Sequence, residues 1–155
     1  MSKKPIKRHV ALQPLSREHH HGLLFCWKIR EGFKRNIAIE RIKKYADWFW
    51  SSHLVQHFET EEAILFPILP AENSKVKKAV ADHRRLKSLF ENSDDIRKSL
   101  SVLEEALEAH IRFEERDLFN EIQQVATAAQ LADVENHHHA PFSDDWADEF
   151  WKDKK

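Results

Sequence analysis

The stretch His57-Phe58-Glu59-Thr60-Glu61-Glu62-Ala63-Ile64-Leu65-Phe66 decides the fold of this chain, because its pattern occurs twice. The pattern is a histidine, three further residues, two glutamates, two further residues and Leu-Phe. It returns at His110-Ile111-Arg112-Phe113-Glu114-Glu115-Arg116-Asp117-Leu118-Phe119. Residues four apart on an α-helix lie on one face, one turn above each other. Each copy therefore directs an imidazole and a carboxylate the same way, and two copies facing each other across a helical bundle would form a metal site.

The composition indicates one mostly helical domain. The chain has 155 residues, of which 41% are hydrophobic and 33% charged, and its net charge is −1. A net charge this close to zero creates no overall electrostatic attraction to nucleic acid or to an anionic membrane, so we expect neither as a partner. Glycine is scarce and helix formers dominate, which favours an all-α fold.

The cellular compartment is predicted from the absence of disulfide-forming cysteine pairs, of a signal peptide and of a membrane span in this sequence. Cys26 is the only cysteine, so no intrachain disulfide and no thiolate metal cluster can form, which suits a reducing setting. The basic start of the chain leads into no apolar run of the kind that signal peptides contain. No apolar stretch approaches the roughly 18 residues needed to span a bilayer. We therefore expect a cytoplasmic protein.

Periodicity and capping signals predict an N-terminal arm, a helical bundle and a C-terminal helical extension. These three parts are residues 1–14, 15–125 and 126–155. The helices of the bundle are expected at about 16–32, 36–66, 74–90 and 96–125, with Ser16 as the first cap. A capping-box pattern at Thr127 and Gln130 opens a short helix, and Phe142, Trp146 and Phe150 predict an amphipathic helix that packs on the bundle.

Polar residues interrupt the predicted inward faces of the bundle. In the first helix, His20 follows the helical spacing of Leu23, Leu24 and Trp27, so His20 is expected to point inward. The expected ligand set contains one lone histidine and one His-Glu pair from each half of the chain: His20, His57, Glu61, His83, His110 and Glu114.

This set favours two metal ions over one. Glu61 and Glu114 would bridge the ions, and the four imidazoles would be terminal ligands. Imidazole and carboxylate ligands without thiolate suit iron, manganese or zinc. A single His-Glu pair on a helix is more often a surface pair, but two copies inside one longer repeat favour a metal site.

The pattern resembles the hemerythrin family, specifically the hemerythrin-like His-His-Glu cation-binding domain. The resemblance rests on Arg17-Glu18-His19-His20, on Asp82-His83 and on the two copies of the repeat. It implies an up-down-up-down four-helix bundle with a non-haem di-iron centre that is carboxylate-bridged and oxo- or hydroxo-bridged. It also implies binding or sensing of O₂ or nitric oxide, iron handling, or peroxide chemistry.

The chain departs from the oxygen carriers of that family in two places. Their third helix carries two ligand histidines four residues apart, whereas Ala79 and Lys87 stand four residues on either side of His83. Their last carboxylate is an aspartate five residues after its histidine, whereas here Glu114 follows His110 by four. The expected count is therefore four histidines and two glutamates, which leaves one more open position than in the carriers.

Several other polar residues remain open as contributors. His53 lies one turn before His57 and could fill the open position as a ligand or support the ligands from outside, and His19 or His21 would enter the site if the first helix starts differently. Glu62 and Glu115 are expected in solvent or hydrogen-bonded to a ligand imidazole. His137-His138-His139 has the composition of a metal-binding tract but is expected to be exposed.

These observations favour a metal- and ligand-binding protein over an enzyme. The leading hypothesis is a di-iron protein that binds O₂, nitric oxide or peroxide for storage, sensing or scavenging. The alternatives are a di-iron peroxidase or oxidase, a protein of iron handling or iron–sulfur repair, and a metal-free interaction bundle. A homodimer through the terminal aromatic helix is left open.

Overall fold

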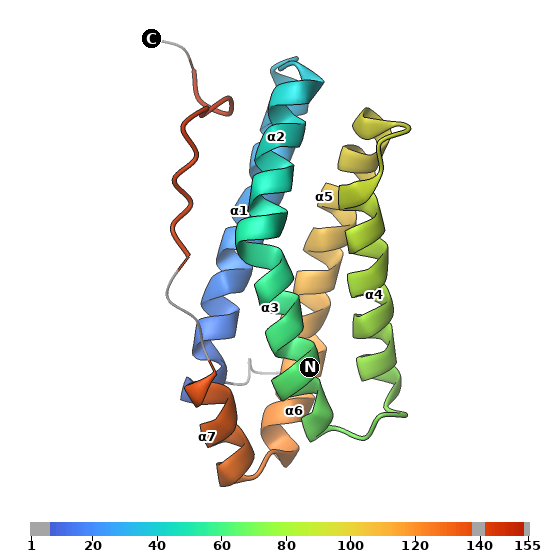
Figure 1. Cartoon of the computed structure of the whole chain (residues 1–155). Coiled ribbons are helices and arrows are strands. Elements are labelled where there is room, and N and C mark those ends of the chain that lie inside the picture. The colour runs from blue at the N-terminus through green and yellow to red at the C-terminus, as the bar shows by residue number, and fades with distance from the viewer. Residues whose placement is uncertain (1–6, 138–141, 154–155) are drawn as a thin grey trace, which may run out of the picture.

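The computed structural model describes residues 7–137 and 142–153, and it is all-helical, with no strand in those ranges (Figure 1). The α-helices and shorter helical turns, in chain order, are η1 (Val10–Leu12), α1 (Gln13–Lys34), α2 (Ile39–Phe49), η2 (Trp50–Leu54), α3 (Val55–Thr60), η3 (Glu61–Leu65), η4 (Phe66–Ile68), α4 (Ser74–Glu91), α5 (Ile96–Phe113), η5 (Glu114–Leu118), α6 (Phe119–Val125) and α7 (Ala128–Asn136).

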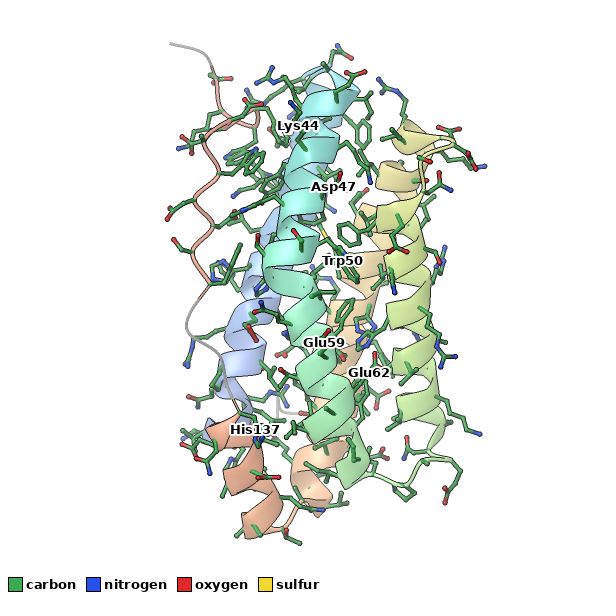
Figure 2. All side chains as sticks on the ribbon, in the orientation of Figure 1. Lys44, Asp47, Trp50, Glu59, Glu62 and His137 are labelled. Carbon is green, nitrogen blue, oxygen red and sulfur yellow. The ribbon has the colours of Figure 1, made fainter. Side chains whose placement is uncertain are left out.

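The long helical segments lie side by side and enclose the core. Figure 1 shows α1, the run α2–α3, α4 and the run α5–α6 extending along one common direction. Helix α5 packs against both α1 and α4, and side chains fill the space between the segments (Figure 2). Within the described ranges, no helix combines the length and apolar character needed to cross a bilayer.

Side-chain caps fix the starts of α4, α5 and α7. The Asn73 side chain accepts hydrogen bonds from the backbone N–H groups of Lys75 and Val76, which fixes the start of α4 where the sequence predicts it. Thr127 and Gln130 form the predicted capping box at the start of α7. The first helix begins earlier in the chain than the sequence predicts.

Helix α1 begins at Gln13, before the predicted cap at Ser16. Pro14 lies in its first turn, where the missing N–H of proline costs nothing, so this proline does not delay the helix. The Ser16 hydroxyl instead donates to Oε2 of Glu115, 2.8 Å away. The start of α1 is therefore tied across the bundle to η5.

π-Helical turns interrupt the second and last long segments at equivalent places. Glu61 begins η3 and Glu114 begins η5, so each copy of the repeated sequence changes from α- to π-helical hydrogen bonding at its inward glutamate. A π-helical turn widens the helix locally and shifts the phase of the residues that follow. The two halves of the chain therefore share a backbone irregularity as well as a motif.

The apolar core consists of two clusters with a polar layer between them. The upper cluster contains Phe25, Tyr45 and Phe49, and the lower cluster contains Leu65 and Phe119. Along α3–η3 and along α5–η5, the repeated histidine and glutamate occupy the turns between the two clusters. The polar layer is therefore buried from both ends of the bundle.

Residues 142–153 correct the prediction of a terminal amphipathic helix, because they contain no helix. The segment runs alongside the bundle (Figure 1), and Phe142, Trp146 and Phe150 pack on the upper cluster as expected. From 142 to 150 exposed residues alternate with more buried ones, which is the period of an extended chain. A spacing of four residues fits that period as well as a helix, so the aromatic positions alone could not distinguish the two.

Two acidic residues on the inward face of this segment fasten it to the bundle. Asp144 accepts from Lys28 Nζ at 2.6 Å and from the Tyr45 hydroxyl at 3.2 Å, and the Asp148 carboxylate accepts from Nε and Nη2 of Arg41. Lys28 is only 5% exposed, and its ammonium also lies over the Trp151 ring, 4.1 Å from the centroid.

We predict that Asp144→Ala lowers the free energy of unfolding by about 3 kcal/mol, because it leaves the buried Lys28 ammonium unpaired. Urea denaturation followed by tryptophan fluorescence measures the change. Glu149→Ala is the matched control, since the Glu149–Lys152 pair is exposed and its loss should cost about 0.5 kcal/mol or less. Equal small effects in both variants would show that the segment does not depend on this pair.

Candidate metal centre

Six buried side chains converge in the polar layer and form two overlapping groups. One group is His19, His57, Glu61 and Glu114, and the other is Glu61, His83, His110 and Glu114. In each group, one nitrogen or oxygen atom per residue lies within 4.8 Å of all the others. Both glutamates belong to both groups, so the two groups, each of which could hold a metal ion, share their carboxylates.

Five of the six residues predicted as ligands lie in these groups, and His20 does not. His20 is exposed, and His19, which was open as an alternative, points inward and is 4% exposed. The inward face of α1 contains Leu15, His19, Gly22, Cys26 and Ile29. Placing Trp27 on that face was wrong as well, because its side chain is 42% exposed.

Gly22 explains why the apolar pattern misplaced the first histidine. This residue lies on the inward face, where a Cβ would stand 2.6 Å from Cδ1 of Ile111. The isoleucine occupies the space that a side chain on α1 would otherwise fill. An inward position without a side chain contributes nothing to a hydrophobic stripe, so the half-buried Leu23 and Leu24 dominated the pattern.

Each carboxylate has one oxygen close to an imidazole of the first group and its other oxygen close to an imidazole of the second group. The closest approaches of imidazole Nε2 to carboxylate oxygen are His19 to Glu114 Oε1 at 2.9 Å, His57 to Glu61 Oε2 at 3.2 Å, His83 to Glu61 Oε1 at 3.0 Å and His110 to Glu114 Oε2 at 3.4 Å. Atoms bound to one ion at about 2.0–2.2 Å stand about 3–3.5 Å from each other. The spacing is therefore that of donor atoms that could bind a common cation.

Apart from the close imidazole–carboxylate approaches to one another, the inner atoms of these side chains have no hydrogen-bond partner among the described residues. They are the four Nε2 atoms of His19, His57, His83 and His110 and all four carboxylate oxygens of Glu61 and Glu114. Burying so many polar atoms without partners is costly, and a protein normally satisfies them. Imidazole nitrogens and carboxylate oxygens that converge in this way are suitable ligands for iron, manganese or zinc.

The outer nitrogen of each imidazole is satisfied by a carboxylate from the neighbouring helical segment. The Nδ1 to carboxylate distances are 2.7 Å for His19–Glu115, 3.1 Å for His57–Glu18, 2.7 Å for His83–Glu62 and 3.0 Å for His110–Asp82. These bonds form a closed ring, because each segment orients the histidine of the next and the last orients the first. Such bonds fix the tautomer that leaves Nε2 free to bind a metal.

Two of these four carboxylates were not foreseen as participants. The sequence suggested that Glu62 and Glu115 could bond to an imidazole, but Glu18 and Asp82 were missed. The signal was present, since each unforeseen acid directly precedes a lone inward histidine, in Glu18-His19 and Asp82-His83. Aligning these two dipeptides would also have identified His19 as the inward histidine.

Charge interactions within the layer shift its pKa values. Burial opposes protonation of His57, but the adjacent carboxylates of Glu61 and Glu18 outweigh it and raise the pKa of His57 to about 9. The same balance, with Glu114 and Asp82 as partners, raises the pKa of His110 to about 10. Without a cation, these imidazoles hold protons, which a bound metal would have to displace.

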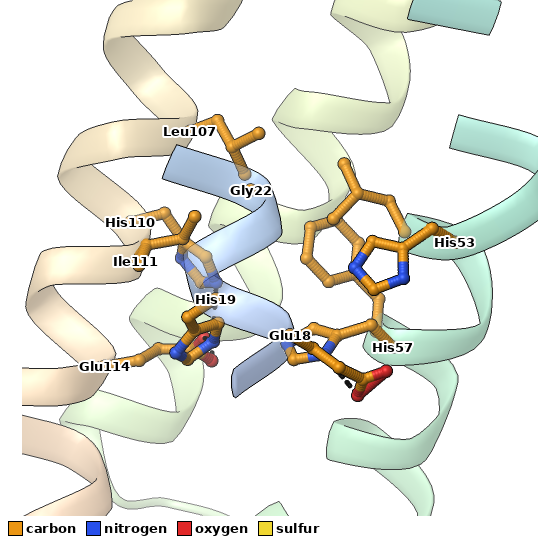
Figure 3. Close-up of a pocket in the computed structure, with 11 residues that line it drawn as sticks. Glu18, His19, Gly22, His53, His57, Leu107, His110, Ile111 and Glu114 are labelled. Atoms are coloured by element: carbon orange, nitrogen blue, oxygen red, sulfur yellow. Dashed lines mark hydrogen bonds and ion pairs between the residues drawn. The ribbon is translucent and has the colours of Figure 1, made fainter. Parts of the chain in front are cut away.

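A small cavity adjoins the layer on its upper side. It has a volume of about 10 Å³, close to the space that one water molecule needs. Figure 3 shows His53 and His57 on one side of it and His110 and Ile111 on the other, with Gly22 of α1 between them. The cavity is therefore large enough only for a water, diatomic or similarly small molecule.

The remaining candidate histidines lie outside both groups. His53 is buried beside the cavity, and burial lowers its pKa to about 4, so its imidazole is neutral. His137 is exposed at the end of α7 (Figure 2) and bonds to the backbone carbonyl of Asp133, while 138–139 fall outside the described residues.

We predict that the metal-free protein loses stability as the pH rises from 7 to 9. The folded-state pKa values of His57 and His110 exceed the unfolded value of about 6.5. Their protonated forms therefore stabilise the fold fully below about pH 6.5, and this contribution is lost as the pH rises through about 9 to 10. We expect the free energy of unfolding to fall by about 1–3 kcal/mol per pH unit in this window.

Urea denaturation of chelator-treated protein at several pH values measures this slope. His110→Gln should make the slope shallower, whereas His20→Gln, which changes an exposed imidazole, should leave it unchanged. A stability that is flat or rises between pH 7 and 9 would contradict the protonated state described for the layer.

Comparison with known proteins agrees with this geometry. A family model described as the hemerythrin HHE cation binding domain matches residues 11–122. No curated protein and no solved structure matches the chain. The matched range covers more than half of the sequence and includes all six converging side chains. The chain therefore belongs to the hemerythrin HHE cation-binding domain family.

Proposed function

We propose that this chain is a non-haem di-iron protein that binds O₂ or a related small molecule such as nitric oxide or peroxide. Its bundle would have the up-down-up-down topology that the family implies. The observation that carries the proposal is the set of eight buried donor atoms, from four imidazoles and two carboxylates, that face one another without hydrogen-bond partners. Membership of a cation-binding family supports the same conclusion.

The donor arrangement supports two ions with shared carboxylates. Glu61 presents Oε2 to His57 and Oε1 to His83, so its two oxygens serve different groups. Glu114 does the same with Oε1 toward His19 and Oε2 toward His110. Each ion would then have two imidazoles of its own and one oxygen from each bridging carboxylate.

This donor count leaves positions for a small molecule. Two imidazoles and two carboxylate oxygens per ion are fewer donors than iron commonly takes, and open positions distinguish reactive from structural metal sites. When bound, the two iron ions would supply redox chemistry toward O₂, nitric oxide or peroxide. The surrounding residues limit access, because the adjoining cavity has room only for a molecule of about that size.

Metal analysis of the native protein, paired with an absorption spectrum in air, tests the proposal. Near two irons per chain with near-ultraviolet charge-transfer bands is the expected result. No iron after anaerobic reconstitution with ferrous salt would overturn it. A peroxide assay over many turnovers separates a binding protein, which reacts once per site, from a peroxidase.

We predict that His19→Ala and His20→Ala differ sharply although they change neighbouring residues. The first removes a buried donor and should reduce the iron content to about one per chain or less, whereas the second removes an exposed imidazole and should retain both ions. Glu61→Ala and His110→Ala should likewise empty or halve the site. Elemental analysis after reconstitution measures occupancy, and full occupancy in His19→Ala would refute its assignment as a ligand.

We predict a smaller effect from the outer carboxylates. Glu62→Gln should weaken metal affinity by about 10–100-fold, because Glu62 orients His83 and increases its basicity. Glu59→Gln changes an exposed acid in the preceding turn, labelled with Glu62 in Figure 2, and should leave affinity unchanged. Competition against a coloured chelator measures both. Indistinguishable affinities would show that the outer hydrogen bond does not influence the site.

A further inference from the structure

A second pocket lies between the run from η2 to η3 and helix α4, on the outer side of the bundle. Its volume is about 270 Å³, and it opens to solvent. This volume lies just below the range of about 300–1,000 Å³ that is typical of small-molecule sites, so an organic molecule with one or two rings would fit. Figure 2 labels three residues that line it, Trp50, Glu59 and Glu62. Of the six converging side chains, only His83 reaches its wall.

The floor of this pocket is an aromatic corner. The rings of Trp50 and Phe58 meet there with centroids 5.8 Å apart and planes inclined by 67°. Packing holds both rings in place, because Trp50 stacks on Phe90 at 4.9 Å and Phe58 stacks on His83 at 3.8 Å. Val55 adds an aliphatic group. A flat ring suits such a corner, since it can stack on one aromatic ring and meet the other edge-on.

Two basic side chains border the pocket without a counter-charge. Arg84 and Lys87 lie three residues apart on one face of α4, and both are exposed. Neither side chain forms a hydrogen bond or an ion pair with a residue that the structure describes. On the opposite wall, Glu62 is hydrogen-bonded to His83, which leaves Glu59 as the one acid of the lining without such a partner in the described ranges. Two unengaged cations against one anion favour a negatively charged occupant.

We propose that this pocket is a binding site for an aromatic carboxylate. The ring would lie in the corner formed by Trp50 and Phe58. The carboxylate would accept hydrogen bonds from Arg84, whose planar guanidinium matches both carboxylate oxygens, and from Lys87. An aliphatic acid would leave the aromatic corner unfilled, and an uncharged ring would leave both cations unpaired. The inference goes beyond the proposed function, because the site recognises an organic acid through side chains and needs no iron.

Calorimetric titration of the full chain, as purified, with the bicyclic acid naphthoate tests the site. In the pocket variant, Arg84→Ala with Lys87→Ala, the dissociation constant should rise by about tenfold or more. This is the lower end of the loss expected for hydrogen bonds to a charged group, because both side chains are exposed. The matched control is Arg85→Ala with Lys77→Ala, which removes the same two charges from exposed positions of α4 outside the pocket. Its dissociation constant should stay within about twofold, since salt screens distant exposed charges.

Two further probes test the two halves of the ligand on the unaltered chain. Naphthamide keeps the rings but has no charge, and acetate keeps the carboxylate but has no ring. Each should bind about tenfold more weakly than naphthoate or worse, because each loses either the charged hydrogen bonds or the apolar contact. Far-ultraviolet circular dichroism checks that the variants fold. If the pocket variant did not fold, the comparison of the three probes decides the matter.

The outcomes distinguish this site from other ways of binding an acid. Unchanged naphthoate affinity in the folded pocket variant would overturn the site, and this is also the result expected if the carboxylate bound at the metal centre. An equal loss in the pocket variant and its control would show unspecific attraction to a basic helix and would overturn the site as well. So would the absence of binding at millimolar naphthoate. Iron content is measured separately, so failure of this inference leaves the di-iron proposal standing, and the reverse also holds.

Discussion

The constraint on which this structure depends is the burial of eight ligand-type atoms whose closest polar neighbours are one another. A bundle core of this size would be more stable with apolar residues in the same turns, since unpaired polar groups cost free energy. The rest of the fold limits that cost. Apolar clusters close the layer above and below, and the ring of outer carboxylates satisfies every Nδ1. What remains unsatisfied is directed inward, where a cation can use it.

The ring also couples the helices to one another through the site. Glu115 near the end of the bundle orients His19 near its start, and Ser16 donates to the same carboxylate. A displacement of the last segment would therefore change a donor on the first. The π-helical turns at Glu61 and Glu114 belong to the same arrangement, because they occur where both chain halves carry the bridging carboxylates. The centre is thus a property of the whole bundle and of no single helix.

The sequence was sufficient to predict which face of a helix points inward where the inward positions carry large apolar side chains. The inward faces of the later helices were predicted correctly through His57, Glu61, His83, His110 and Glu114, because large apolar residues continue the same stripes on either side. Prediction failed on α1, where Gly22 leaves an inward position empty for Ile111 and Lys28 is buried by a segment far along the chain. It failed again at 142–150, where a spacing of four residues fits both a helix and an extended chain. Tertiary contacts decided all of these cases, and single-sequence periodicity does not contain them.

The terminal extended segment has a consequence for the order of events during protein synthesis. Residues 142–153 leave the ribosome after every helix of the bundle, and domains fold as the chain emerges from its N-terminus. Until they arrive, Tyr45 and Phe49 lack their cover and the Lys28 ammonium lacks its counter-ion. The six converging side chains, by contrast, all come from segments that precede α7. Nascent chains would therefore assemble a metal-competent layer first and complete the upper apolar core last, with Phe142 closing over His53 as the final step.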